Sequence, residues 1–299
     1  MDGETIEGIL APVLGDVQAV AGWLWDRGWA ERNAGNLSID VSGRFAIGAT
    51  GAAGGGAAPS VAILSDRPFV PYPIPDPHLA ARWLLVTATG ARFRDIAREP
   101  GLGVLLVRVE EGLDGYRIAW DASGGRLAAT SELISHLLIH ARLRATGSTH
   151  RAVLHTHPTH LIALNQRGAI GGDAAALNRA LWSMMPEVKV FLPEGVGLAP
   201  YRLPGSRLLA EATVAAVAEH RLILWDKHGC VAVERDIQAA FDLIDTANKA
   251  AMLYLLASAD GLPPRGLSDE ELHDLADLAR RLEVGRAAGP DERASGAES

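Results

Sequence analysis

The stretch RAVLHTHPTH, residues 151–160, constrains the fold more than any other part of this chain. Side chains alternate between the two faces of a β-strand, so His155 and His157 should lie on the same side. The apolar residues 152–154 suit a buried strand, and Pro158 removes a backbone donor that a longer strand would need. Two neutral imidazoles at a strand end form half of a transition-metal site, although two hydrogen-bonded core histidines are the structural alternative.

His228 is the candidate for a third metal ligand. It lies in a polar turn between two short apolar runs, and Gly229 after it lets the backbone turn closely. By spacing alone, His150, His160 and His220 compete for the same role. Three imidazoles leave a coordination position open, which is typical of a catalytic metal site. A structural zinc site usually has four ligands, often thiolates, and this chain has one cysteine.

Glu132 follows Thr130 and Ser131 at the expected start of a helix. The simplest interpretation is a carboxylate that the helix dipole stabilises. The functional interpretation is a general base, or a metal ligand that the substrate displaces. Thr130 and Ser131, together with the free amides of the first helical turn, could instead hold a phosphate group.

Other polar positions carry weaker signals. Asn33, Gly35 and Asn36 form a donor-rich loop after the first expected helix, and Thr89 lies in a loop after an expected strand. By composition these are ordinary turn residues. Glu187 lies before another expected strand, where a solvated glutamate is the default interpretation.

Several classes of function have little support. Neither Lys227 nor Lys249 has neighbours that would depress the pKa of its amine for Schiff-base chemistry, and there is no GxxxxGK[ST] loop for a nucleotide. The net charge of −8, without a Lys/Arg cluster, argues against general nucleic-acid binding. A small phosphorylated ligand needs only a few local donors and stays possible.

The expected location is the cytoplasm. Cys230 is the single cysteine and cannot form an internal disulfide, which suits a reducing compartment. The first thirty residues lack a basic start followed by an apolar run, so we expect no signal peptide. No stretch approaches the roughly 18–20 uninterrupted apolar residues of a membrane span.

Periodicity predicts helices interspersed with strands. Helices are expected at 4–29, 132–146, 159–166, 173–185, 205–220, 237–259 and 268–283. Strands are expected at 37–47 (with a turn at 40–43), 83–87, 103–109, 114–120, 152–157, 188–192, 222–225 and 231–233. Because the βαβ alternation is not regular, the pattern favours helices packed on a mixed or antiparallel sheet in one domain. The Gly/Ala-rich segment 49–59 is expected to be a flexible loop.

Taken together, these pieces resemble the class II aldolase/adducin family, and within it the bacterial rhamnulose-1-phosphate branch. The matching stretches are ERNAGNLS (31–38), LLVTATGARFRD (84–95), TSELISH (130–136), VLHTHPTHLIAL (153–164), PEVKVFLPEGVGLAPYRLPG (186–205), LILWDKHGC (222–230) and AFDLIDTANKAA (240–251). The resemblance implies an α/β fold with one catalytic domain at 1–284, a mixed, mainly antiparallel sheet and helices on both faces. A disordered tail would follow at 285–299.

The resemblance also implies an activity and a metal. The activity is zinc-dependent retro-aldol cleavage of L-rhamnulose 1-phosphate to dihydroxyacetone phosphate and L-lactaldehyde, through a metal-stabilised enediolate. His155, His157 and His228 match the zinc ligands of the family. Glu132 matches the carboxylate that moves the proton.

Further positions are implied in the same way. The phosphate-binding loops of the family match Asn33, Gly35, Asn36, Thr89 and Ser131. Glu187 matches an acidic residue that reaches into the site of the neighbouring subunit. The resemblance therefore implies a homotetramer with its sites at subunit interfaces, acting on a small phosphorylated ketose.

Two alternatives stay open at this point. The first is an epimerase, dehydratase or aldolase that acts on another ketose phosphate with the same scaffold. The second is a non-catalytic, adducin-like interaction module. The retention of His155, His157, His228 and Glu132 disfavours the second alternative.

Overall fold

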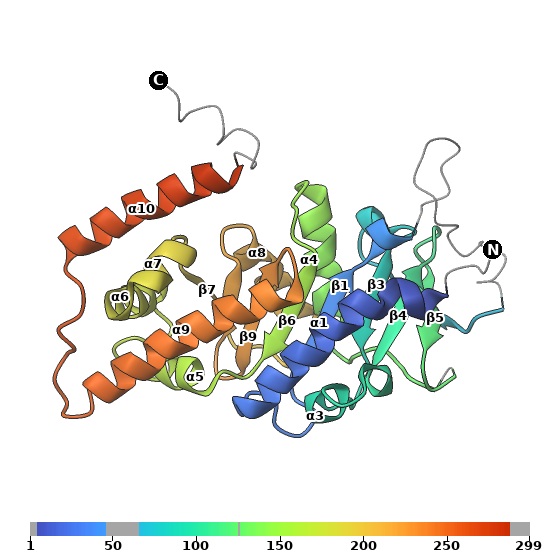
Figure 1. The fold of residues 1–299 in the computed structure, drawn as a ribbon, viewed down its shortest axis with the longest axis horizontal. Coiled ribbons are helices and arrows are strands. Elements are labelled where there is room, and N and C mark those ends of the chain that lie inside the picture. Colours follow the sequence, from blue (N-terminus) through green and yellow to red (C-terminus); the bar gives the residue numbers. More distant parts are fainter. Residues whose placement is uncertain (1–4, 46–65, 125, 288–299) are drawn as a thin grey trace.

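The computed structural model describes residues 5–45, 66–124 and 126–287. Within them, one nine-stranded sheet has the strand order β2-β5-β4-β3-β1-β6-β9-β8-β7 (Figure 1). The strands are β1 (Asn36–Asp40), β2 (Phe69–Pro71), β3 (Trp83–Thr87), β4 (Val104–Val109), β5 (Gly115–Asp121), β6 (Ala152–Thr156), β7 (Val196–Ala199), β8 (Leu222–Trp225) and β9 (Gly229–Glu234). All neighbouring strands are antiparallel except the edge pair β7 and β8, which is parallel.

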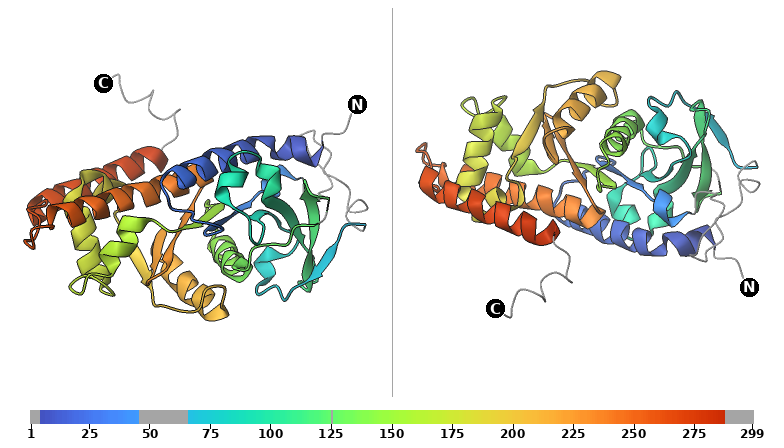
Figure 2. Two further views of the ribbon diagram at one scale, coloured as in Figure 1. Left: turned by 90° about the horizontal axis from the view of Figure 1, so that it is seen from below. Right: turned by 90° about the horizontal axis from the view of Figure 1, so that it is seen from above.

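Helices cover both faces of this sheet. The described helices are α1 (Ile6–Asp26), α3 (Phe93–Ile96), α4 (Leu133–Ala145), α5 (Thr159–Asn165), α6 (Ala174–Met184), α7 (Pro186–Phe191), α8 (Arg207–Val217), α9 (Ile237–Ala257) and α10 (Asp269–Ala287). Short 3-10 turns occur at Ser42–Arg44, Pro77–Leu79 and Pro100–Leu102. Figure 2 shows α1 and α9 along one side of the sheet and α4 with α8 on the other. The predicted architecture, a mainly antiparallel sheet with helices on both faces, is confirmed.

The central strands are buried on both faces, and their alternating side chains feed different cores. In β3, Leu85 joins the core under α1 and α9, whereas Leu84 and Val86 join a second core with Leu133 and Leu137 of α4. A third core packs α8 and the end of α4 against β6, β8 and β9. Strands β3 and β8, which are covered on both sides, read as continuous apolar runs, and their sequences therefore predicted them well.

Helix α1 owes its apolar character to this packing. It is the one described helix that is long and apolar enough to cross a membrane, with a mean hydropathy of 1.2. Its buried side chains recur at helical spacing and belong to the core under α1 and α9: Leu10, Val13, Val17, Val20, Ala21 and Leu24. The fold therefore gives this helix a partner for its apolar face.

One predicted strand is wrong. Residues 188–191 of this run are helical, because α7 begins at Pro186 and extends to Phe191. Proline has the fixed φ of a first helical residue, which starts a helix here, and only Val188 within α7 is buried. A short apolar run does not distinguish a strand from one buried side of a short helix.

The strand that forms nearby was not predicted. It is β7, which follows Gly195 (φ +77°) and pairs with β8 along the edge of the sheet. The hairpin expected within 37–47 is also wrong, because β1 ends at Asp40 and pairs with β3 and β6 instead. Segment 49–59 lies outside the described residues, as do 288–299 of the expected tail. Helix α10 continues to Ala287.

The register of the sheet brings three chain segments to one place. In the pairing of β1 with β6, Asn36 lies opposite His155, and Ser38 of β1 lies opposite Val86 of β3. At the end of β6, Thr156 lies opposite Cys230 of β9. The start of β1, the end of β6 and the start of β9 therefore meet at the same end of the sheet.

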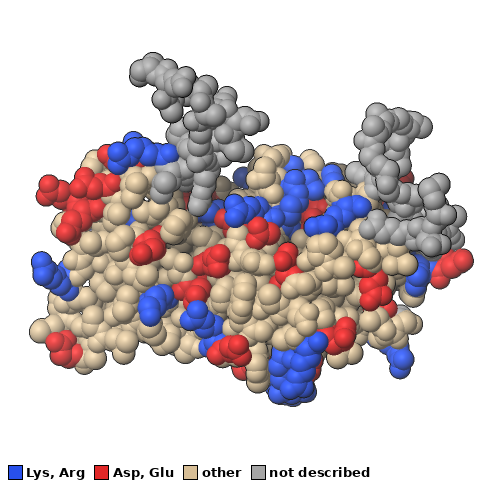
Figure 3. Space-filling view, viewed as in Figure 1, with Lys and Arg blue, Asp and Glu red and all other residues tan. Residues whose placement is uncertain are grey.

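Charged residues of both signs are interspersed over the surface. Figure 3 shows Lys and Arg mixed with Asp and Glu among broad neutral areas on the face seen in Figure 1. The described part of this face carries no continuous basic area of the kind that neutralises a phosphate backbone.

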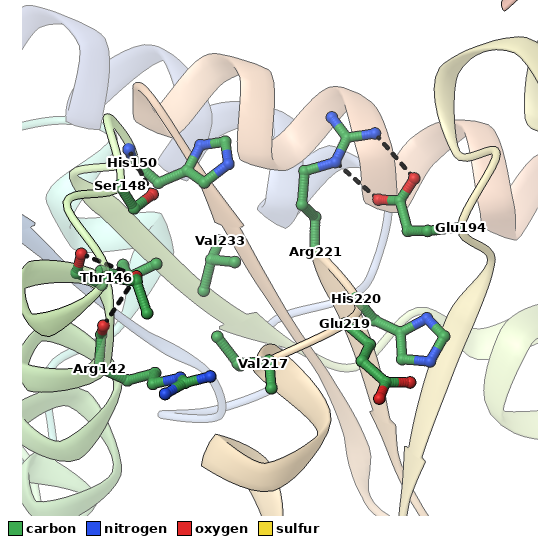
Figure 4. A pocket seen from close by; sticks show the side chains of 12 residues that line it. Arg142, Thr146, Ser148, His150, Glu194, Val217, Glu219, His220, Arg221 and Val233 are labelled. Carbon is green, nitrogen blue, oxygen red and sulfur yellow. Dashed lines mark hydrogen bonds and ion pairs between the residues drawn. The ribbon is translucent and has the colours of Figure 1, made fainter. Parts of the chain in front are cut away.

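A partly buried ion cluster joins the loop after α7 to the edge strands. Arg221, at the start of β8, contacts Glu194 at 2.6 Å and Glu234 of β9 at 2.6 Å. Figure 4 shows Arg221 and Glu194 beside a cavity of about 320 Å³. Burial alone would raise the pKa of Glu234, but the nearby His150 at 3.5 Å and hydrogen bonds from the Arg235 amide and Arg221 outweigh it and lower the pKa to about 2. The cluster thus favours the ionised carboxylate.

We expect Glu234→Gln to lower the free energy of unfolding at pH 7 by about 1–3 kcal/mol, because it weakens hydrogen bonds to a charged group. The stabilisation by Glu234 is present above the unfolded pKa near 4.5 and is lost as pH falls towards about 2. The difference between wild type and variant should therefore shrink between pH 4.5 and pH 2 in urea denaturation. Glu219→Gln, which removes an exposed charge beside the same cavity, is the control and should change little. Equal effects of the two substitutions would contradict the assignment.

Candidate functional site

A cavity of about 180 Å³ lies where β1 begins and β6 ends. The structure brings to it every predicted site residue except Glu187. The residues that line it are Asn33, Ala34, Gly35, Asn36, Ala88, Thr89, Gly90, Thr130, Ser131, Glu132, His155, His157 and His228. Glu187 is exposed near the start of α7 and is not among them.

The loop after α1 fixes the end of β6. The backbone carbonyl of Trp29 accepts hydrogen bonds from the Thr156 hydroxyl at 2.7 Å and from the His157 amide at 3.0 Å. Pro158 then ends the strand, as predicted, and α5 begins at the next residue. The two histidines of the motif are therefore held against the cavity.

The three predicted ligands form a compact cluster. The ring centroids of His155 and His157 lie 5.2 Å apart, and His228 lies 4.9 and 5.0 Å from them. One nitrogen from each of the three rings lies within 4.8 Å of the others. Three imidazole nitrogens at this spacing suit a transition-metal ion.

The remaining hydrogen bonds of these rings leave nitrogens free for such an ion. His155 Nδ1 bonds the Cys230 carbonyl at 2.9 Å, and His157 Nδ1 bonds the Glu31 carboxylate at 2.7 Å. Among the described residues, His157 Nε2 and His228 Nδ1 are buried without any hydrogen-bond partner. Buried nitrogens of this kind need a partner, and a metal ion would satisfy them.

The surroundings of His155 and His228 favour neutral imidazoles, which is the form that binds metal. Burial, together with the nearby rings of His157 and His228, holds the pKa of His155 well below its ordinary value. Burial also lowers the pKa of His228, against an opposing effect of Glu132. Burial by itself would raise the pKa of Glu31, but the hydrogen bond with His157 outweighs it and lowers that pKa.

Two glycines permit this close packing. A Cβ at Gly229 would lie 2.6 Å from the Thr156 carbonyl oxygen and 2.7 Å from a ring carbon of His157. A Cβ at Gly35 would lie 2.8 Å from the His155 carbonyl oxygen, and Gly35 also has φ +79°. A side chain at Gly229 would displace the histidine rings, and one at Gly35 would displace the backbone of His155 or the ring of Phe93.

Glu132 points into the cavity from the start of α4. It is the N-cap residue of this helix. The Glu132 carboxylate makes no cap hydrogen bond, because its Oε2 accepts from Asn36 Nδ2 at 2.7 Å and lies 3.6 Å from His155 Nε2. Thr130 accepts a hydrogen bond from the Glu132 amide at 3.3 Å.

The other half of the cavity consists of neutral donors. Asn33, Gly35, Thr89 and Ser131 line it, and the described lining residues include no lysine or arginine. An anion bound there would be held by backbone amides, hydroxyl groups and the start of α4. This arrangement suits a small phosphorylated ligand.

Two residues of the site were not predicted. Glu31 orients His157, but it lies on an exposed loop that carries no motif of its own. Trp225 is buried and its ring lies 4.4 Å from the ring of His155 and 5.2 Å from that of His228. The indole N–H of Trp225 donates to Thr213 at 2.8 Å, which fixes the ring. The only available signal for Trp225 was its position three residues before His228.

Comparisons with known proteins agree with this site. Residues 72–255 match the family described as Class II Aldolase and Adducin N-terminal domain. The chain is 35% identical to a rhamnulose-1-phosphate aldolase of Bacteroides thetaiotaomicron, over 89% of this chain and 94% of the relative. It is 33% identical to a rhamnulose-1-phosphate aldolase of Escherichia coli, over 83% of this chain and 86% of the relative.

Solved structures show the same fold. A sugar-phosphate aldolase from Thermotoga maritima superposes with a TM-score of 0.66 at 28% identity, over 86% of this chain and 99% of the other. An L-fuculose 1-phosphate aldolase superposes with a TM-score of 0.57 at 18% identity, over 90% and 96% of the two chains. At that identity the second likeness concerns the fold alone.

We expect Glu31→Gln to weaken binding of a divalent metal by about 10–100-fold, because a neutral amide orients His157 less firmly than a carboxylate does. Titration of the metal-free protein with Zn²⁺ against a chromophoric chelator measures the affinity. Glu99→Gln, an exposed glutamate elsewhere, is the control and should leave the affinity unchanged. Unchanged affinity in Glu31→Gln would remove Glu31 from the site.

Proposed function

This chain belongs to the class II aldolase and adducin family, and we propose that it is the zinc-dependent aldolase that cleaves L-rhamnulose 1-phosphate to dihydroxyacetone phosphate and L-lactaldehyde. Membership makes it an aldolase, a lyase with the metal dependence of its class. The choice of substrate is supported chiefly by identity with rhamnulose-1-phosphate aldolases over most of both chains.

His155, His157 and His228 would hold the metal ion. When bound, the ion would supply Lewis acidity to stabilise negative charge that develops on the substrate oxygens. The choice of zinc is supported by three neutral nitrogen ligands and an open cavity beside them. Glu31, the Cys230 carbonyl and Trp225 would fix the orientation of the imidazole rings.

Glu132 would move the proton. When the C3–C4 bond of the ketose breaks, the C4 hydroxyl loses its proton as the aldehyde forms, and C3 must gain a proton before dihydroxyacetone phosphate leaves. The Glu132 carboxylate lies inside the cavity next to the histidine cluster, and Asn36 holds one of its oxygens. A carboxyl group in that place can deliver the proton in cleavage and remove it in the reverse reaction.

The phosphate group would lie against Asn33, Gly35, Asn36, Thr89 and Ser131. These residues offer neutral donors, and the positive end of α4 adds to them. Anchoring the unreactive end of the substrate places the C3–C4 bond between the metal site and Glu132.

We also propose the assembly and the location of the enzyme. Glu187 is exposed and absent from the cavity of its own chain, which is compatible with a role in the site of a neighbouring subunit of a homotetramer. The catalytic domain would span 1–284 and act in the cytoplasm.

The proposal predicts that zinc-loaded protein releases dihydroxyacetone phosphate from L-rhamnulose 1-phosphate. A coupled dehydrogenase that oxidises NADH measures the release. EDTA should abolish it and added Zn²⁺ should restore it, because the reaction needs the ion. Release by protein that is free of metal would contradict the mechanism. If the protein binds zinc but releases no dihydroxyacetone phosphate, the substrate is another ketose phosphate.

Two variants separate the metal from the proton transfer. His157→Ala should lose both bound zinc and activity, since it removes a ligand. Glu132→Gln should keep zinc but lose about 10²–10⁴-fold in rate, because an amide cannot transfer the proton. Normal cleavage by Glu132→Gln would exclude it as the proton-moving group.

The assembly predicts the behaviour of Glu187→Ala. Light scattering should give about four times the chain mass of 31.6 kDa for both wild type and variant. The variant should keep zinc and lose kcat/KM, because the missing carboxylate belongs to the site of the next subunit. A monomeric wild type, or a fully active variant, would exclude this role.

A further inference from the structure

A row of polar side chains runs along the inner side of α4. Glu132, His136, His140 and Arg144 recur every four residues, and α4 packs against β1 (Figure 1). On β1, alternate residues are also polar; they are Asn36, Ser38 and Asp40. Four helical residues rise about 6 Å and two strand residues about 6.6 Å, so the two rows stay in step. We call these seven residues the polar ladder.

The upper part of the polar ladder is a continuous chain of short contacts. Asn36 Nδ2 bonds Glu132 Oε2 at 2.7 Å, and Asn36 Oδ1 bonds His136 Nε2 at 2.5 Å. Ser38 Oγ then bonds His136 Nδ1 at 2.7 Å and His140 Nε2 at 2.8 Å. All five residues are buried, with at most 7% of any of them exposed.

The lower end of the ladder is ionic. Arg144 contacts Asp40 through two nitrogens, at 2.6 and 2.8 Å. Burial would raise the pKa of Asp40, but hydrogen bonds from Ser42 and Arg144 and the nearby His140 outweigh it and lower that pKa. The ladder thus ends on an anchored ion pair.

The Glu132 carboxylate sets the direction of each hydrogen bond in the upper part of the polar ladder. A carboxylate only accepts, so Asn36 must turn its NH₂ group towards Glu132 and its oxygen towards His136. His136 must then donate from Nε2 and accept at Nδ1, where the Ser38 hydroxyl donates. Ser38 in turn accepts from Nε2–H of His140. The chain runs one way, from His140 to Glu132.

Burial keeps both imidazoles neutral, as this direction requires. It holds the pKa of His136 well below its ordinary value, and the rings of His140 and His155 act in the same sense. It lowers the pKa of His140 to about 4, although Asp40 opposes the shift. A charged imidazole would donate from both nitrogens and could not accept from Ser38.

The surroundings make a role in packing alone a poor explanation. The polar ladder passes between two apolar clusters, with Leu133, Leu137 and Ala141 on one side and Ile139 and Leu143 on the other. Apolar residues in these positions could have joined the two clusters at lower cost, because buried polar groups stabilise little even when fully paired. Each ladder group is paired, and its chain of donors ends on Glu132.

We propose that His136 is a positioning residue for Glu132, acting through Asn36. By donating to Asn36 Oδ1, His136 prevents the amide from turning over, so the NH₂ group stays on Glu132. The carboxylate is thereby held at the histidine cluster, 3.6 Å from His155 Nε2. Ser38 and His140 hold His136 in the required tautomer. This role rests on the proposed function, in which Glu132 moves the proton.

Kinetics of three variants test the positioning role. His136→Leu should lower kcat by about 10–100-fold, because a displaced carboxylate transfers its proton poorly. The KM for L-rhamnulose 1-phosphate and the bound zinc should not change. His136→Gln should recover most of kcat, since its amide NH₂ can take the place of Nε2–H. Ser135→Ala is the control, because Ser135 is buried beside His136 but its hydroxyl has no partner among the described residues.

The outcome is decided by whether kcat falls while KM and bound zinc stay unchanged. The role is supported if His136→Leu loses kcat, His136→Gln recovers most of it, and Ser135→Ala shows no loss. A kcat within twofold of wild type, or an equal loss in Ser135→Ala, overturns it. If His136→Leu does not fold, Ser38→Ala removes the hydroxyl that donates to His136 Nδ1 and should lower kcat in the same selective way.

The tautomer of His136 is a second test and needs no substrate. In the ¹⁵N-labelled wild-type enzyme, long-range ¹H–¹⁵N spectra should show His136 neutral, protonated at Nε2 and bare at Nδ1. A charged ring or protonated Nδ1 overturns the proposal, even if the enzyme cleaves the sugar phosphate. If His136 has the expected tautomer but the protein does not cleave L-rhamnulose 1-phosphate, the hydrogen-bond order of the polar ladder is supported and the proposed substrate is wrong.

Discussion

Strand β1 pairs with β3 on one side and with β6 on the other, and each part of the cavity depends on this pairing. Asn36 begins β1 opposite His155, while the loops before β1 and after β3 supply the neutral donors. Because the strands are antiparallel, the start of β1 coincides with the end of β6, where the motif of two histidines leaves the sheet. A slip of one residue would turn Asn36, Ser38 and Asp40 away from α4, and so separate Glu132 from its partners.

The same constraint explains which features could be read from the sequence. The strands 83–87 and 222–225 are buried on both faces, so their apolar runs predicted them at the observed residues. His155 and His157 were recognisable because the evidence is local: strand period, apolar residues before them and a proline after. The third ligand was less certain from spacing, and the structure brings His228 rather than His150, His160 or His220 to the other two.

The features that were missed depend on contacts between distant residues. Glu31 meets His157 across 126 positions of the chain, and Asn36 meets Glu132 across 96. No local sequence pattern indicates that residues so far apart in the chain will be in contact. Helix α7 and strand β7 were misjudged for a different reason: both are short, and β7 lies on the edge of the sheet, so neither has the long apolar period on which prediction depends. The assignment of Asn33, Gly35, Asn36 and Thr89 to a phosphate came from family resemblance, because turn residues alone carry no such signal.

Charge balance links the metal site to the polar ladder. Three neutral imidazoles bring no charge to a divalent ion, so in the proposed site Glu31 and Glu132 are the two carboxylates that can offset it. Glu31 does so at the rim, through His157, whereas Glu132 does so inside the cavity, where it must also be free to exchange a proton. A carboxylate with that second task cannot be fixed by a cation of the protein without losing basicity. A neutral amide, itself held by a neutral imidazole, fixes the position of Glu132 while leaving its charge available for the reaction. That requirement gives a physical reason why polar groups rather than apolar ones fill the space between α4 and β1.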